Sequence, residues 1–198
     1  MTLSDDVRVM LRPFAVYREL GDADEPAPGR AALARAGFVQ LVLGGFVSLT
    51  SAGRLVAFHV ASVFVFWAFL PIVEALAVAL AVRLASPGKD VRRALALYFT
   101  GHAPWLFFLL VVALVPFVAP DVYATMAWLL ARGVLPLLLL VALGWGGVLT
   151  FACFRAGLGL GRGRAAGATA IFYAVLVGGI TSYYLATNQI QPQVPGIP

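Results

Sequence analysis

The sequence predicts an all-α integral membrane protein: five transmembrane helices, an amphipathic N-terminal segment, the N-terminus inside and the C-terminus outside. Three observations support this fold class. Of the 198 residues, 62% are hydrophobic and only 12% are charged, and the mean hydropathy is +0.94. A soluble domain is about 45–50% apolar and about 25% charged. Because a soluble fold cannot bury so much apolar surface, the expected solvent is lipid.

Residues 1–32 are predicted to form a cytoplasmic amphipathic segment and a linker. Five apolar residues recur at the spacing of one helix face: Leu3, Val7, Met10, Phe14 and Tyr17. Pro13 interrupts this pattern. A proline is tolerated in the first turn of a helix but not in its interior, so we expect a break there or a second short helix that begins at Pro13.

The transmembrane domain is predicted over residues 33–186. Its five apolar stretches are long enough for the ~20 residues that a crossing needs: about 33–52, 55–84, 94–118, 133–154 and 165–186. The second is too long for one upright crossing, so a tilt, a bend at Pro71 or an extension beyond the bilayer is expected. Residues 121–132 fit either a short interfacial helix or the start of a longer fourth helix. Residues 187–198, which carry no charge, are predicted to form a short external tail.

The basic residues predict the orientation. With the five spans predicted above, 12 of the 14 Lys and Arg residues lie on the side of the N-terminus, and only Arg54 and Arg132 lie on the other. Loops rich in Lys and Arg stay in the cytoplasm, which predicts N-inside and C-outside. The formal net charge of +5 then reflects cytoplasmic loops that face membrane lipids. No nucleic-acid partner is expected, because no basic patch is interleaved with exposed aromatic residues outside the spans.

Glu74 and His102 are the candidate polar pair inside the membrane. Both lie about ten residues from the connector 86–93, on antiparallel spans, so they are expected at a similar depth. An ionisable group within a span is costly and needs a partner. The pair is interpreted either as a polar clamp that fixes helix packing or as part of a proton or ion path.

Small residues at every fourth position form a second pattern. They follow the fifth span and, in part, the first: Ala166, Ala170, Ala174, Gly178, Ser182, Gly44 and Ser48. Such stripes let helix backbones approach closely in a membrane. They serve either the packing of the five spans against each other or an interface with a partner or a second copy.

The motifs of common enzymes are missing. The sequence has no HExxH zinc motif and no GxSxG nucleophile elbow, and GLGLGRG lacks the order of a nucleotide-binding loop. Cys153 is the single cysteine, so no cysteine-built zinc site is possible. We therefore expect no catalytic residue, no cofactor and no metal, and the glycine-rich stretch is interpreted as a cytoplasmic turn.

Three features together resemble the Ypt-interacting protein (Yip) family, specifically its bacterial members. They are the proline-containing amphipathic segment, the basic connector in AVRLASPGKDVRRALALYFTGHAPWLFFLL and the Gly/Arg turn in GLGLGRGRAAGATA. The likeness covers the chain from about Pro13 to Ala186. It implies a non-enzymatic protein of the bacterial inner membrane. Eukaryotic relatives bind Rab-type GTPases in vesicle traffic, a role that does not carry over because bacteria lack that machinery.

Two functions are compatible with these features. The first is a membrane scaffold or accessory subunit that binds another membrane protein, or a second copy of itself, through its spans or its cytoplasmic face. The alternative is a small transporter or channel that uses Glu74 and His102.

Overall fold

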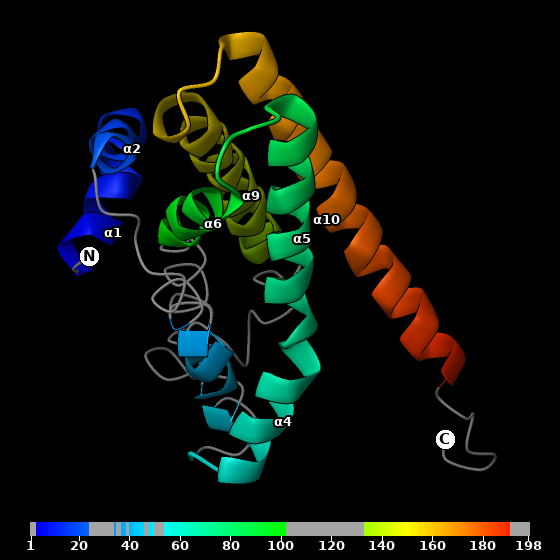
Figure 1. Ribbon diagram of the computed structural model, residues 1–198. Helices are drawn as coiled ribbons and strands as arrows, with labels where there is room; N and C mark the ends of the chain where they lie inside the picture. Colours follow the sequence, from blue (N-terminus) through cyan, green and yellow to red (C-terminus); the bar gives the residue numbers. More distant parts are fainter. Residues whose placement is uncertain are drawn as a thin grey trace.

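A computed structural model describes three long stretches of the chain and several shorter ones: residues 3–23, 34, 37–38, 40–45, 48–49, 54–101 and 133–190. Within these residues every regular element is a helix and no strand occurs (Figure 1). The predicted all-α class is confirmed. Residues 102–118, which would complete the third predicted span, residues 121–132 and the tail from 191 onward lie outside the described residues.

The N-terminal segment folds into two short helices, α1 (Leu3–Leu11) and α2 (Pro13–Asp22). Proline occupies the first turn of α2, where its missing N–H would have no helical partner in any case. Arg12, between the two helices, has a non-helical backbone with φ −140° and ψ 60°. The predicted second helix that begins at Pro13 is confirmed.

The apolar face of this segment differs from the expected one. Val9, Val16 and Tyr17 are buried against the rest of the protein, whereas Val7 and Phe14 are exposed. The expected face assumed one continuous helical repeat. The backbone breaks at Arg12, but buried residues lie on both sides of the break, so the face that docks is offset from the apolar repeat rather than divided by the break.

The long second apolar stretch forms two helices, α4 (Ala57–Trp67) and α5 (Phe69–Ala85). The interruption is a turn at Ala68, whose N–H donates to the carbonyl of Val65 at 3.3 Å. Pro71 explains the position of this turn. A proline lacks the N–H that would bond to the carbonyl four residues earlier, here that of Trp67, and its ring clashes with that carbonyl. The chain therefore changes helix three residues ahead of the proline.

The next helix, α6 (Val91–Thr100), begins at a capping aspartate. The Asp90 carboxylate accepts a hydrogen bond from the backbone N–H of Arg92 at 2.8 Å, which satisfies one of the free donors at a helix start. The helix ends at Gly101, whose N–H donates to the carbonyl of Tyr98 at 2.9 Å. This helix covers only the beginning of the predicted third span.

The last part of the chain holds α9 (Leu135–Ala152), a π-helical turn η2 (Cys153–Gly157) and α10 (Arg162–Ile190). Two stretches, Pro136–Gly157 and Arg162–Tyr183, are helical, long and apolar enough to cross a membrane, judged by length and composition. The connection between them turns at Gly159, whose φ of +67° suits a residue without a β-carbon.

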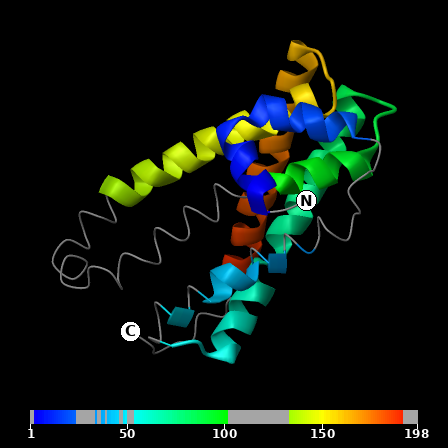
Figure 2. The same cartoon turned by 90° about the vertical axis from the view of Figure 1, so that its left-hand side faces the viewer.

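The core forms where α5, α6, α9 and α10 meet, and α2 lies across their shared end (Figures 1 and 2). The most extensive contact joins α5 to α10. These two helices are antiparallel, since Phe69 at the start of α5 stacks on Tyr183 near the end of α10, with ring centroids 3.7 Å apart. Arg93 ties α2 to α6 by donating hydrogen bonds to the carbonyls of Gly21 and Ala23.

Candidate functional site

Glu74 lies inside the helix assembly and is only 6% exposed. Its Oε1 accepts a hydrogen bond from the hydroxyl of Tyr98 at 3.1 Å. The Tyr98 ring in turn packs on Phe172, with centroids 5.0 Å apart. The contact therefore links α5, α6 and α10. His102, the partner expected from the sequence, lies outside the described residues, so the Glu74–His102 pair stays a prediction.

A cavity of about 50 Å³ adjoins this hydrogen bond. Polar and apolar side chains from five elements line it: Tyr17, Glu74, Tyr98, Gly101, Leu143, Gly146, Leu149, Thr150, Phe172, Tyr173 and Leu176. A water molecule needs roughly 10–15 Å³, whereas small-molecule sites measure roughly 300–1,000 Å³. The cavity thus has room for water-sized molecules beside a carboxylate and several hydroxyls, but not for a larger solute.

The small-residue stripe of the fifth predicted span runs along the outer side of α10. Ala166, Ala170, Ala174, Gly178 and Ser182 are all exposed. A β-carbon placed on Gly178 would meet nothing within 4 Å. The opposite side of α10, with Ala165, Ala168 and Phe172, is buried in the core. In the described part of the chain, α10 therefore packs through one face and leaves its small-residue face open.

Gly44 and Ser48 have a different setting. A β-carbon on Gly44 would lie 2.8 Å from the carbonyl oxygen of Val60, so the glycine permits a close backbone approach to α4. Ser48 is fully buried. Its hydroxyl donates to the carbonyl of Arg54 at 2.9 Å and accepts from the N–H of Val56 at 2.7 Å. These two residues serve contacts within the chain.

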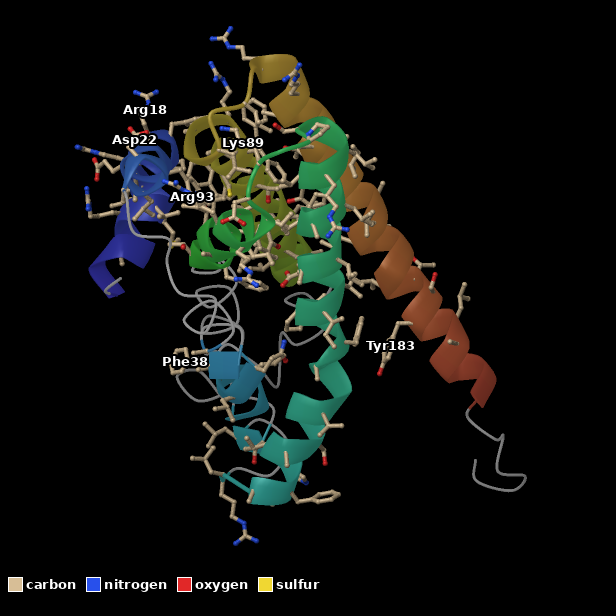
Figure 3. All side chains as sticks on the ribbon, in the orientation of Figure 1. Arg18, Asp22, Phe38, Lys89, Arg93 and Tyr183 are labelled. Atoms are coloured by element: carbon tan, nitrogen blue, oxygen red, sulfur yellow. The ribbon has the colours of Figure 1, made fainter. Side chains whose placement is uncertain are left out.

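Sequence reasoning missed a basic pocket at the end of the molecule where α10 begins. It measures about 560 Å³ and lies between α2 and the η2–α10 turn, lined by Phe14, Arg18, Asp22, Phe151, Arg155, Ala156, Gly159 and Arg162. Figure 3 shows Arg18 and Asp22 on α2, at the same end as Lys89 and Arg93 and far from Tyr183. The only sequence signal was that these arginines belong to the same side of the membrane; their convergence requires the docking of α2.

Among the described residues, no three His, Cys, Asp or Glu side chains gather as a metal site would require. The chain matches no protein-family model, no curated protein and no solved structure. The resemblance to the Yip family therefore stays a prediction that rests on the sequence features described above.

Proposed function

We propose that this protein is a non-enzymatic scaffold or accessory subunit of the bacterial cytoplasmic membrane, with five spans, and that it binds another membrane protein or a second copy of itself. The observation that carries the proposal is the open small-residue face of α10. The Yip-family resemblance favours the same class of function.

Exposed apolar side chains support a membrane location. On α5, Ile72, Leu76, Leu80 and Leu84 follow one helix face and are 42–67% exposed. A contiguous apolar strip of this kind is unfavourable on a water-soluble monomer. In a bilayer the same strip is the surface that contacts acyl chains.

The distribution of charge supports the N-inside orientation. The turns at 86–90 and 158–161 share one end of the molecule, because α5 ends there and the antiparallel α10 begins there. Most basic side chains of the described residues belong to that end: Arg83, Lys89, Arg92, Arg93, Arg155, Arg162 and Arg164. Cytoplasmic ends of membrane helices carry this excess of Lys and Arg.

A helix with two packing faces explains how the partner would bind. The buried face of α10 joins α5 and α9 within the chain. The outer face presents Ala170, Ala174 and Gly178, whose small side chains would let a partner helix approach to backbone contact. In a membrane such close van der Waals packing drives association, since apolar side chains alone gain nothing by leaving lipid.

Co-purification tests this proposal. The full chain is isolated from native membranes in mild detergent, and its mass and stoichiometric partners are determined by mass spectrometry. We expect a complex with a second protein or a second copy. The double variant Ala170→Leu/Ala174→Leu, which adds bulk to the open face, should lose that partner. A matched variant, Leu76→Phe/Leu80→Phe, adds bulk to the lipid-facing side of α5 and should keep it.

Either of two results would count against the scaffold. One is a wild-type chain that purifies alone as a single copy. The other is a stripe variant that keeps its partner as well as the α5 variant does.

A small transporter or channel is the second candidate, because Glu74 adjoins an internal cavity together with several hydroxyl groups. Reconstitution of the chain in vesicles with an imposed pH gradient tests it. A proton path through Glu74 predicts proton flux that Glu74→Gln abolishes. The scaffold predicts no such flux and predicts that Glu74→Gln still binds its partner.

A further inference from the structure

The basic pocket between α2 and the η2–α10 turn has an excess of positive charge. Three arginines, Arg18, Arg155 and Arg162, line it with a single carboxylate, Asp22. In the part of the chain that the structure describes, none of these four side chains forms an ion pair. Arg155 donates from one nitrogen to the carbonyl of Leu160 at 2.6 Å. This bond holds the guanidinium in place within the turn and leaves its other donors available.

The start of α10 adds donors on the same side. The residue before the helix is Gly161, which has no side-chain oxygen to cap the first N–H groups. The first backbone bond of this turn runs from the N–H of Ala165 to the carbonyl of Gly161 at 2.9 Å. The preceding N–H groups of residues 162–164 have no partner within the helix, and such groups favour anions. Arg162 belongs both to this turn and to the pocket wall.

The remaining walls are apolar. Phe14 of α2 meets Phe151 of α9 edge to face, with ring centroids 6.2 Å apart. Phe14 is 41% exposed and continues a row of exposed apolar side chains on α1 with Val7 and Leu11. A soluble phosphate would gain nothing from this row. Acyl chains would cover it, because short helices with one apolar and one basic side lie in the headgroup region of a membrane.

The geometry points to a binding site for the headgroup of an anionic phospholipid in this pocket. The phosphate lies among Arg18, Arg155 and Arg162, where guanidinium groups bond phosphate oxygens through paired N–H donors. The acyl chains leave past Phe14 along Val7 and Leu11. The basic end of the protein belongs at the depth of the cytoplasmic headgroups, where pockets between helices take such lipids. This site is independent of the partner-binding face on α10.

Lipid titration of the full chain tests the site. The protein in neutral detergent is titrated with phosphatidylglycerol and, separately, with phosphatidylcholine, and bound lipid is counted by native mass spectrometry. The wild type should prefer phosphatidylglycerol. Arg18→Gln/Arg162→Gln should weaken that binding by about thirtyfold, since each basic residue beside anionic headgroups contributes about fivefold. The control Lys89→Gln/Arg92→Gln removes the same charge from exposed positions outside the pocket and should weaken the binding much less.

A second variant and a second probe complete the experiment. Arg18→Gln alone alters only an exposed side chain of α2, so it keeps the test valid if the double variant is unstable, and it should weaken binding about fivefold. Inorganic phosphate should displace the lipid only weakly. Equal weakening by the pocket and control pairs, no preference for phosphatidylglycerol, or binding of inorganic phosphate without binding of the lipid would each overturn the assignment.

Discussion

Gly21 of α2 and Gly157 of η2 touch backbone to backbone: a β-carbon on Gly21 would collide with the carbonyl oxygen of Gly157. The contact sets the position of the N-terminal segment on the helix assembly. Tyr17 docks at the same place: a β-carbon added to Gly157 would lie 3.5 Å from the carbonyl oxygen of Tyr17 and 3.7 Å from its β-carbon. The cavity beside Glu74 and the basic pocket both include α2 residues, so both depend on this approach.

Gly21→Ala should therefore loosen the docking of α2. The added methyl group meets backbone, which cannot move aside as a side chain would, and overpacking of this kind costs about 1–3 kcal/mol. Thermal unfolding in detergent measures the loss. Gly163→Ala is the matched control, because a β-carbon there meets no atom within 4 Å and alanine favours the helix. Equal stability of the two variants would show that the close approach is not required.

The hydrogen bond between Tyr98 and Glu74 should appear as a coupling energy. A double-mutant cycle with Tyr98→Phe and Glu74→Leu, which removes the donor and the acceptor in turn, followed by unfolding in detergent, isolates the pair from the other contacts of each side chain. Hydrogen bonds between membrane helices average about 0.6 kcal/mol and reach about 1.7 kcal/mol, so we expect a coupling in this range. Strict additivity of the two substitutions would mean that the pair does not stabilise the fold.

Neighbouring glycines on α10 should respond in opposite ways. A β-carbon on Gly179 would lie 2.6 Å from a methyl carbon of Val73, while one on Gly178 would meet nothing within 4 Å. Valine is stiff in a helix, so Val73 cannot rotate out of the way. Gly179→Ala should push α5 from α10 and cost about 1–3 kcal/mol, whereas Gly178→Ala should raise thermal stability slightly, because alanine favours a helix interior. A larger loss for Gly178→Ala would reverse the assignment of the two faces.

Cys153 should resist thiol reagents while the protein is folded. It is 1% exposed and part of the central core, so a reagent reaches the sulfur only after the helices separate. Mass spectrometry after maleimide treatment should show labelling in denaturant and almost none in mild detergent. The control is Gly161→Cys in a Cys153→Ala background, where the thiol occupies an exposed turn and should react readily. Rapid labelling of Cys153 in the folded protein would contradict its burial.

Local chemistry explains which features were predictable. Pro13 starts α2 because a proline restricts its own backbone wherever the chain lies. Pro71 likewise ends the helix before it, although the sequence did not show that the break would fall at Ala68. The buried face of the N-terminal segment was not predictable in the same way, since it depends on how the segment docks on the helix assembly, where Gly21 approaches Gly157.

The sequence by itself determined the helical class, the strongly apolar composition and the gathering of basic residues at turns, because these follow from residue type and periodicity. Only the tertiary structure decided which face of α10 is open, that Glu74 accepts a hydrogen bond from Tyr98, and that Arg18 lines one pocket with Arg155 and Arg162. The physical reason is that these relationships join residues far apart in the chain. They arise only when the helices pack in one particular arrangement.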